Sequence, residues 1–325
     1  MSQQKFLVTG AMGCLGSWVL HNLVKSGKPV VATDLAPRPD RARLLMTDDE
    51  IDQIAWESLD VTDNQGVQST VSEQGITHII HLAGLQIPFC KADPGRGAQV
   101  NVVGTVNLLE AARHNQVQGL CYASSLAALG PDTCYPDKPV RDDVNLYPVS
   151  LYGVYKLANE GTAKIFWQDW QVGSVGLRPY IVYGVGRDQG MTSDIAKAVL
   201  AAAAGKPFHL RFSGPVALQY ADDTAKVFIQ AAESGHQGAA ACNLRGDVIE
   251  VEEFVELLLT ACPGAKLTIE NNNPLPFPSD IDDSGIRNIL GELPHTTVEA
   301  AIRADLDRFE TLLFQGKVDL AQLEN

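Results

Sequence analysis

Short apolar segments alternate with longer amphipathic segments through the first half of the chain, and this alternation most restricts the possible folds. Helical periodicity is clearest at 17–26, 99–114 and 152–170. The runs that indicate buried strands are 6–9, 30–34, 54–60, 77–82, 119–124 and 173–177. Strands that alternate with helices form βαβ units, whose parallel sheet is covered by helices on both faces. We therefore predict an α/β fold built on a doubly wound parallel sheet.

The second half has a different texture. Glycine and proline become frequent after about residue 180, an alanine-rich helix is expected at 195–204, and a closing amphipathic helix at 297–314. The proline-punctuated segment 271–278 can be neither regular helix nor central strand. We predict that residues 1–180 form the sheet domain, with later segments returning to it, and that 181–325 form mainly a smaller substrate-binding lobe.

Composition excludes several classes of protein. The formal net charge of −14 argues against a broad surface for nucleic acid or anionic lipid. No apolar run approaches the about 20 residues that a membrane span requires. The first residues lead directly into a strand pattern, which leaves no room for a signal peptide. Six scattered cysteines without a CxxC pair indicate reduced thiols, so we expect a cytoplasmic protein.

A glycine-rich turn follows the first predicted strand. Gly10, Gly13 and Gly16 have the spacing GxxGxxG. Such a turn lets the backbone approach a pyrophosphate closely and directs the free N–H groups of the next helix toward it. The pattern is weak by itself, since glycines are common in tight turns. In a strand-turn-helix context it favours dinucleotide binding.

The carboxylate that ends the second predicted strand strengthens this interpretation. Asp34 can accept hydrogen bonds from both adenosine ribose hydroxyls and would repel a 2′-phosphate, which favours NAD over NADP. Arg38, Arg41 and Arg43 weaken that preference slightly, although we expect them to form a solvated basic loop. Asp60 follows the third strand and could contact the adenine or cap the next helix.

A tyrosine and a lysine lie one helical turn apart in the predicted helix at 152–170. Tyr152 and Lys156 therefore share a face, and a neighbouring ammonium together with a positive nicotinamide ring would lower the phenol pKa. Ser124 and Ser125 end the fifth predicted strand, at the sheet edge where ligands bind. Either serine could orient a substrate oxygen. The alternative is that the serine caps a helix or turn, and this alternative is more serious for Ser124 than for Ser125. The pair His78 and His81 fits a buried strand better than a metal site.

With these motifs the chain resembles the extended short-chain dehydrogenase/reductases, also called the NAD-dependent epimerase/dehydratase family. The matching segments, in family order, are TGAMGCLG at 9–16, Asp34, Asp60-Val61, HLAG at 81–84, NVVGTVNLLEAA at 101–112, SS at 124–125, YGVYK at 152–156, LRPYIVYG at 177–184 and QYADD at 219–223. The resemblance implies a Rossmann-type fold, NAD as cofactor, and homodimers formed through the helices at 101–114 and 152–170.

The resemblance also implies the roles of individual residues. Tyr152 would be the catalytic acid/base, Lys156 its modulator, and Ser125 the hydroxyl that orients the substrate. The implied cofactor-binding residues are Gly10, Gly13, Cys14, Leu15, Gly16, Asp34, Asp60, Val61, Leu82, Ala83, Gly84, Asn101, Lys156 and Tyr180.

Departures from the family pattern bear on the substrate. Members that bind nucleotide sugars usually have an asparagine where this chain has Ile181, and an arginine ahead of the segment here written QYADD. Both would contact a diphosphate, and both are missing, although Arg187 and Arg211 could substitute. We therefore expect a smaller substrate (a sugar, sugar acid or polyol) with Gln86, Ser125, Tyr152 and Arg187 as its contacts.

These features favour an NAD-dependent dehydrogenase that acts on a secondary alcohol. The alternative is an epimerase, for a sugar or nucleotide sugar, that returns the hydride after the ketone has rotated. A dehydratase is less favoured because Leu126, rather than an acidic residue, follows Ser125. A non-catalytic NAD-sensing regulator is the hypothesis from a different class, and the complete serine, tyrosine and lysine set argues against it.

Overall fold

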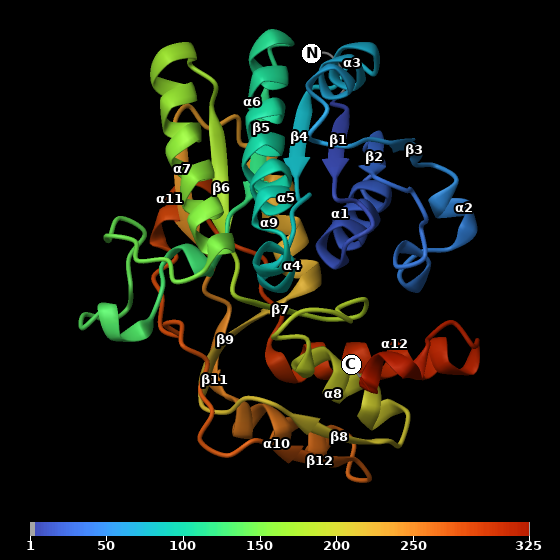
Figure 1. Cartoon of the computed structure of the whole chain (residues 1–325). Helices are drawn as coiled ribbons and strands as arrows, with labels where there is room; N and C mark the ends of the chain where they lie inside the picture. Colours follow the sequence, from blue (N-terminus) through green and yellow to red (C-terminus); the bar gives the residue numbers. More distant parts are fainter. Residues whose placement is uncertain (1–3, 325) are drawn as a thin grey trace.

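The computed structural model of the chain describes residues 4–324 and has a seven-stranded parallel sheet at its centre (Figure 1). The strand order is β10-β6-β5-β4-β1-β2-β3. The strands are β1 (Phe6–Thr9), β2 (Val30–Asp34), β3 (Ala55–Ser58), β4 (His78–His81), β5 (Gly119–Ala123), β6 (Ser174–Arg178) and β10 (Ala239–Asn243). The order reverses direction at β1, as in a doubly wound Rossmann-type sheet, so the predicted fold class is confirmed.

Helices cover both faces of this sheet, which explains why the inner strands β1 and β4 are buried at every residue, whereas the edge strand β3 is intermediate to exposed. In β1, Leu7 packs with Val67 and Leu108 on one face, whereas Val8 packs with Phe228 on the other. The first face is covered by α3 (Asn64–Glu73), α6 (Gly104–His114) and α7 (Leu151–Trp170), and the second by α1 (Cys14–Lys25) and α9 (Ala221–Glu233).

The remaining elements form a smaller lobe beyond the carboxyl ends of the strands, toward which the arrows of β1 and β4 point (Figure 1). One small sheet has the order β11-β9-β7, and β8 pairs with β12. The lobe contains β7 (Ile181–Tyr183), α8 (Asp194–Ala203), β8 (Pro207–Leu210), β9 (Pro215–Tyr220), β11 (Asp247–Glu250), α10 (Val251–Ala261), β12 (Lys266–Ile269), α11 (Ser284–Leu290) and α12 (Val298–Phe314).

Between β9 and β11 the chain leaves the lobe and returns to the main sheet. Helix α9 packs under β4 and β5, and β10 pairs in parallel with β6 along its whole length. The sequence pattern did not resolve β10 as a strand, because its residues are the small side chains Ala239–Asn243 rather than a branched apolar run.

The helix expected at 99–114 is divided. Short helices α4 (Ile87–Ala92) and α5 (Pro94–Ala98) lead into a π-helical turn, Gln99–Val103, and only then into α6. The other short elements are α2 (Asp48–Ile51) and 3₁₀ turns at Ala42–Leu44, Leu126–Ala128, Asp132–Cys134 and Leu320–Glu324. No helix within residues 4–324 is both long and apolar enough to cross a membrane.

Candidate active site

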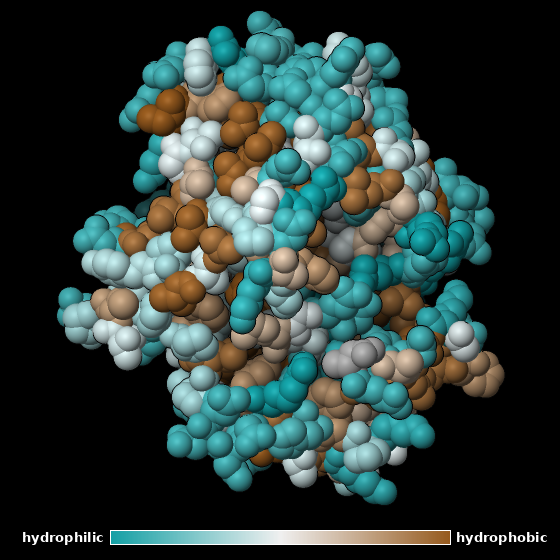
Figure 2. Space-filling view, in the orientation of Figure 1, coloured by the Kyte–Doolittle hydropathy of each residue, from teal (hydrophilic) through white to brown (hydrophobic). Residues whose placement is uncertain are grey.

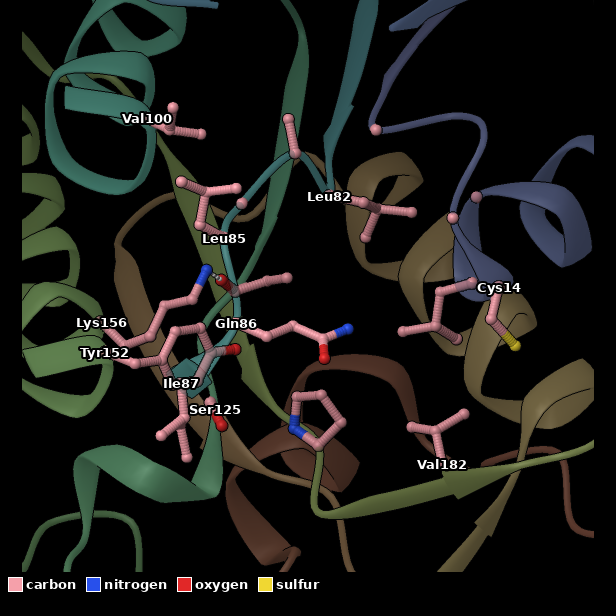
Figure 3. A pocket seen from close by; sticks show the side chains of 18 of the residues that line it. Cys14, Leu82, Leu85, Gln86, Ile87, Val100, Ser125, Tyr152, Lys156 and Val182 are labelled. Atoms are coloured by element: carbon pink, nitrogen blue, oxygen red, sulfur yellow. Dashed lines mark hydrogen bonds between the residues drawn. The ribbon is translucent and has the colours of Figure 1, made fainter. Parts of the chain in front are cut away.

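A cavity of about 540 Å³ lies between the carboxyl ends of the main-sheet strands and the lobe (Figure 3). Lys156, Tyr152 and Ser125 lie on one side of it, Cys14 and Val182 lie on the other, and the side chain of Gln86 reaches into the space between them. Every cofactor and substrate residue predicted above lines this cavity except Asn101. Residues from strands far apart in the sequence thus converge where an open parallel sheet binds its ligands.

The glycine turn is packed too tightly for side chains. Gly10 has φ +69°, and a Cβ atom there would lie 2.6 Å from the backbone nitrogen of Ala83. A Cβ atom on Gly16 would lie 2.4 Å from the carbonyl oxygen of Gly10. Helix α1 begins after Gly13 without a side-chain cap, so its first N–H groups have no side-chain acceptor. This is the arrangement that a pyrophosphate requires.

Asp34 lies at the end of β2 and lines the cavity. Its Oδ2 atom accepts a hydrogen bond from the backbone of Met12 (3.1 Å), and its Oδ1 atom accepts one from Leu35 (2.8 Å). Each carboxylate oxygen has a second lone pair, so the group can still accept hydrogen bonds from two hydroxyls. The carboxylate is therefore fixed in orientation and remains competent to hold a ribose diol.

The basic residues that follow β2 differ from expectation at one position. Arg38 is exposed, and Arg43 pairs with Asp48 at the surface, as predicted for a solvated loop. Arg41 is instead half-buried. Its Nη1 atom donates to the carbonyl oxygen of Met12 (2.8 Å), and its Nη2 atom donates to both oxygens of Asp188 (2.8 and 2.9 Å). This arginine connects the glycine turn to the lobe.

Asp60 stabilises a local turn rather than capping α3. Its Oδ1 atom accepts hydrogen bonds from the backbone and hydroxyl of Thr62 (2.9 and 2.8 Å), and Arg96 contacts Oδ2 at 3.4 Å. Desolvation opposes ionisation, but the Thr62 hydrogen bonds and the Arg96 charge outweigh it and lower the pKa of Asp60. Asp60 and Val61 both line the cavity.

Tyr152, Lys156 and Ser125 meet where α7 crosses the end of β5. Ser150 caps α7 by accepting a hydrogen bond from the backbone of Gly153 (3.1 Å), which fixes the start of the helix. The Nζ atom of Lys156 donates to the carbonyl oxygen of Ala123 (2.7 Å) and lies 5.4 Å from the centre of the Tyr152 ring. The ammonium is thereby held between the strand end and the tyrosine.

The two serines after β5 have roles partly opposite to the expected ones. Ser124 is buried and donates to Glu160, so it caps nothing. Ser125 accepts a hydrogen bond from the backbone of Ala127 (3.2 Å) and so starts a 3₁₀ turn, and its hydroxyl also faces Tyr152. The Ser125 hydroxyl thus caps a turn and also contacts Tyr152. The capping hydrogen bond holds the hydroxyl in the position from which it reaches the tyrosine.

Burial dominates the ionisation of this group. Burial raises the pKa of Tyr152, while the hydrogen bond from Ser125 and the positive charge of Arg187 act against that shift. Burial also lowers the pKa of Lys156 to about 8, partly offset by Cys90 and Glu160. The side chains alone therefore keep Tyr152 protonated at neutral pH, and the lowered phenol pKa expected from the sequence would need the additional positive charge of the cofactor ring.

A buried ion pair behind the site was not predicted. The carboxylate of Glu160 accepts hydrogen bonds from the Nε and Nη2 atoms of Arg178 (2.8 and 2.7 Å) and from Ser124 (2.5 Å). Both charged side chains are 3% exposed. Glu160 follows Lys156 by one helical turn on α7, and this spacing is the sequence signal that could have indicated it. The pair joins α7 to the ends of β5 and β6.

Asn101 lies behind the cavity wall instead of lining it. It is buried in the π-helical turn, and its Nδ2 atom donates to the carbonyl oxygens of Gly97 (3.0 Å) and Leu85 (3.2 Å). Its Oδ1 atom lies against Gly84, where a Cβ atom would approach it to 2.8 Å. Asn101 therefore shapes the loop that carries Gly84, Leu85 and Gln86.

The lobe contributes residues that the sequence did not single out. Met191, Thr192, Leu275 and Phe277 line the cavity, the last two from the proline-punctuated loop. Tyr180 lines it as predicted, and its ring packs edge-on against Phe277 with ring centres 6.1 Å apart. No local motif marks such residues, because they are brought to the cavity by the way the lobe closes over the sheet.

The two arginines considered as anion partners are in different environments. Arg187 lines the cavity. Arg211 does not, because its Nη2 and Nε atoms donate to the fully buried carboxylate of Asp194 (2.6 and 3.0 Å). Arg211 is therefore a structural partner of α8 and lies outside the cavity, although its side chain is 55% exposed.

The strand histidines are satisfied within the core. His81 lies between the hydroxyls of Thr9 (2.7 Å) and Thr105 (3.2 Å), and burial lowers its pKa to about 3. Within residues 4–324 there is no group of three or more His, Cys, Asp or Glu side chains that could hold a metal ion.

The sheet, the glycine turn and the carboxylate at the end of β2 define a dinucleotide-binding α/β protein. Residues 6–244 match the NAD dependent epimerase/dehydratase family, and the chain belongs to that family. This confirms the resemblance inferred from the motifs.

Curated relatives match nearly the whole chain. One is an uncharacterised 37.6 kDa protein of Escherichia coli O111:H-, 28% identical over 92% of this chain and 96% of that protein. Another is the UDP-glucose 4-epimerase of Mycolicibacterium smegmatis, 28% identical over 93% of this chain and 97% of that protein.

Solved structures share the fold. A partial-consensus L-threonine 3-dehydrogenase superposes with a TM-score of 0.82 at 22% identity, covering 94% of this chain and 99% of the other. The UDP-glucose 4-epimerase of Thermus thermophilus, in complex with NAD, superposes with a TM-score of 0.78 at 23% identity, covering 95% and 99%. The same architecture thus occurs in epimerases and in dehydrogenases.

Proposed function

We propose that this protein is an NAD-dependent oxidoreductase that oxidises a secondary alcohol of a sugar, sugar acid or polyol. The observation that carries the proposal is the meeting of Ser125, Tyr152 and Lys156 at one end of a cavity whose other end is the glycine turn and Asp34. A binding protein that only senses NAD has no need of a buried tyrosine and lysine beside an oriented hydroxyl.

The cavity suits NAD. Gly10 and Gly16 leave the close approach that a pyrophosphate needs, and Asp34 offers acceptor positions to the ribose hydroxyls while repelling a 2′-phosphate. Lys156 is near enough to the tyrosine to hold the second ribose as well. NAD held by these residues would supply the acceptor for the hydride of the substrate carbon.

The protein side chains move the proton. Tyr152 accepts the proton of the substrate hydroxyl through its phenol oxygen, and Ser125 donates a hydrogen bond that steadies the same substrate oxygen. Lys156 favours the ionised tyrosine through its charge, and Ala123 fixes the ammonium through its carbonyl oxygen. Because burial raises the pKa of Tyr152, its phenol is protonated when the site is empty. The phenol must therefore release its proton to solvent once substrate and cofactor are in place, and the resulting phenolate accepts the substrate proton.

Replacement of the tyrosine tests the proposal. We expect Tyr152→Phe to reduce turnover to below about 1% of wild type, since general acid–base catalysis is worth 10²–10⁴-fold. The dissociation constant for NAD, measured by calorimetry, should change less than about twofold. NADH formation at 340 nm, with excess NAD and a panel of sugars, sugar acids and polyols, measures turnover. Retained turnover in Tyr152→Phe would overturn the assignment.

The second candidate is an NAD-dependent epimerase with a closed hydride cycle. The similarity to the Mycolicibacterium smegmatis UDP-glucose 4-epimerase over almost the whole chain favours it. An epimerase interconverts its substrate and product without net NADH formation. Product analysis of the same panel, extended to UDP-glucose, therefore distinguishes the two activities: net NADH indicates a dehydrogenase, and a new epimer without NADH indicates an epimerase.

The proposal includes a homodimer formed through α6 and α7. Val103, Leu151, Val154 and Ile165 are 41–50% exposed on this region, and Figure 2 shows brown side chains gathered over these helices at the upper left. Light scattering should give twice 35.0 kDa for the wild type. We expect Val154→Glu with Ile165→Glu to give a monomer, and a wild-type monomer at micromolar concentration would contradict the arrangement.

A further inference from the structure

We propose that the substrate carries a carboxylate and that Arg187 and Gln86 hold it, an inference that rests on the proposed oxidoreductase function and specifies its substrate class. The site is the lobe side of the cavity, where both side chains lie among its lining residues. The proposal selects hydroxy acids, including sugar acids, from the broader group of sugars, sugar acids and polyols.

The charges around the cavity are unevenly paired. Three basic side chains line it: Arg96, Lys156 and Arg187. Arg96 contacts Asp60 at 3.4 Å. Lys156 belongs to the proposed catalytic set and donates to the backbone carbonyl of Ala123. Arg187 has no carboxylate within 4.0 Å among the described residues, and its Nε atom is inaccessible and has no acceptor. The side chain is only half-buried, but a buried polar atom without a partner is costly, and an anion bound by the guanidinium would offset that cost.

The acidic residues that follow Arg187 closely in the sequence are paired with other arginines. Asp188, its immediate neighbour, accepts two hydrogen bonds from Arg41. Asp194 is held by Arg211 through both of its oxygens. Within residues 4–324 the Arg187 guanidinium makes a single hydrogen bond to the protein, a long one of 3.5 Å from Nη2 to the hydroxyl of Thr192. The protein thus satisfies the surrounding carboxylates and leaves this arginine for a ligand.

Gly190 brings the second partner to the same place. A Cβ atom on Gly190 would lie 2.8 Å from the Oε1 atom of Gln86 and 3.1 Å from the Nη2 atom of Arg187. Both polar ends therefore rest over one residue that has no side chain. Gln86 extends into the cavity from the loop after β4 (Figure 3), so its amide can donate a hydrogen bond to an anion that Arg187 binds.

The chemistry of this end of the cavity favours a carboxylate over a diphosphate. One guanidinium matches a single negative charge, and its fork geometry matches the two oxygens of a carboxylate. The neighbouring lining residues from the lobe, Met191, Leu275 and Phe277, are apolar and add no positive charge. Ile181 stands where nucleotide-sugar enzymes usually have a polar contact, and it is completely buried.

The anionic group must lie close to the carbon that is oxidised. Arg187 is close enough to Tyr152 for its positive charge to act against the rise in the pKa of the phenol, and both side chains line the same cavity. A substrate that spans both groups has its carboxylate and its secondary alcohol only a few bonds apart. We therefore expect a small hydroxy acid.

Matched pairs of acid and uncharged compounds test the inference. The pairs are D-glucuronate with D-glucose, D-gluconate with D-glucitol, and D-threonate with D-threitol, with UDP-glucose as the nucleotide probe. We expect kcat/KM, from NADH formation, to be at least tenfold higher for an acid than for its partner. Preference for the uncharged partners or for UDP-glucose would overturn the inference and leave the proposed oxidoreductase function intact.

Variants identify the residue. Arg187→Gln should lower kcat/KM for the preferred acid by at least about 100-fold, mainly through KM, because loss of a charge-assisted partner weakens binding of the anion. Arg187→Lys keeps the positive charge but loses the two-pronged geometry of the guanidinium. Its kcat/KM for the acid should lie between those of the wild type and Arg187→Gln. Arg303→Gln removes a 66% exposed arginine on α12 and is the matched control. Equal losses for acid and uncharged partner in Arg187→Gln would refute the assignment.

Binding measurements separate this inference from the proposed function. Calorimetry with the NAD-loaded Tyr152→Phe protein measures acid affinity without turnover. Acid binding that Arg187→Gln abolishes in this background supports the carboxylate site even if the wild type forms no NADH, in which case only the proposed function fails. Failure of every acid to bind overturns the carboxylate site.

Discussion

Disruption of the buried ion pair between Glu160 and Arg178 should destabilise the protein more than any surface change. The carboxylate accepts three hydrogen bonds of 2.5–2.8 Å, and both side chains are 3% exposed. Removing one partner leaves an uncompensated buried charge, which costs about 3–5 kcal/mol. We therefore expect Glu160→Met and Arg178→Met each to lose that amount of unfolding free energy.

The double variant measures the coupling between the two residues. Glu160→Met with Arg178→Met removes both charges. The groups that lose a partner are then neutral: the hydroxyl of Ser124, the carbonyl of Asp142 and the amide of Asn243. Apolar replacement of a complete pair is often nearly neutral. The double variant should lose no more unfolding free energy than one single variant does. This corresponds to a coupling energy of at least about 3 kcal/mol between the two residues.

Urea unfolding followed by tryptophan fluorescence provides the assay, since Trp167 and Trp170 lie on α7 together with Glu160. At about 2 °C per kcal/mol for a chain of this length, the single variants should melt about 6–10 °C lower. Glu299→Gln, which breaks a pair with both side chains more than half exposed, should cost under about 0.5 kcal/mol. Additive single effects, or a loss of unfolding free energy below about 1 kcal/mol in Glu160→Met, would refute the reasoning.

Three further predictions concern the cofactor site and the lobe. Asp188→Ala frees the Arg41 guanidinium beside the turn that contacts Asp34, so a positive charge becomes available to the 2′-phosphate of NADP. The ratio of NADP to NAD affinity, measured by calorimetry, should therefore rise about fivefold, equivalent to about 1 kcal/mol. An unchanged ratio would contradict this prediction. Gly16→Ala places a Cβ atom 2.4 Å from the carbonyl oxygen of Gly10 and should weaken NAD binding at least about tenfold. Gly264→Ala is the control, because its Cβ atom would have no neighbouring atom within 4 Å, and it should leave NAD binding unchanged. Equal effects of the two variants would contradict the packing argument. Burial raises the pKa of Asp305 to about 7, so its contribution to stability is complete below about pH 4 and is lost as the pH rises through about 7. Asp305→Asn should flatten the melting temperature between pH 5 and 8 and be the more stable form at pH 8, by at most about 4 kcal/mol; a parallel pH profile for both proteins would show that this carboxyl does not titrate in that range.

The sheet domain could be predicted because its information is local. Strands β1 and β2 are buried on both faces, so each is a continuous apolar run with a glycine or an acidic residue at its carboxyl end. Tyr152 and Lys156 are four residues apart on one helix, which fixes their relation before any tertiary structure forms. Their meeting with Ser125 then follows from the order of the strands.

The lobe could not be predicted in the same way. Strand β8 has one buried residue in four and pairs with β12, which lies more than fifty residues later, so neither burial nor a nearby partner marks it. The arginines illustrate the same limit. The sequence does not distinguish Arg41, Arg187 and Arg211. In the fold, Arg41 pairs with Asp188 and Arg211 pairs with Asp194, whereas Arg187 lines the cavity.

The late return of β10 sets an order on biosynthesis. Until Asn243 has left the ribosome, β6 has an open edge, and until α9 has left it, the face of β4 and β5 that this helix covers, including Ile80, is bare. An unpaired edge beside apolar surface is the kind of intermediate that aggregates. The nascent sheet therefore waits for the lobe strands β7–β9 to be translated, and we expect any truncation that ends before β10 to yield an insoluble polypeptide. A gene fusion or split-protein design is better placed in the exposed segment around Gly264, after the main sheet is complete.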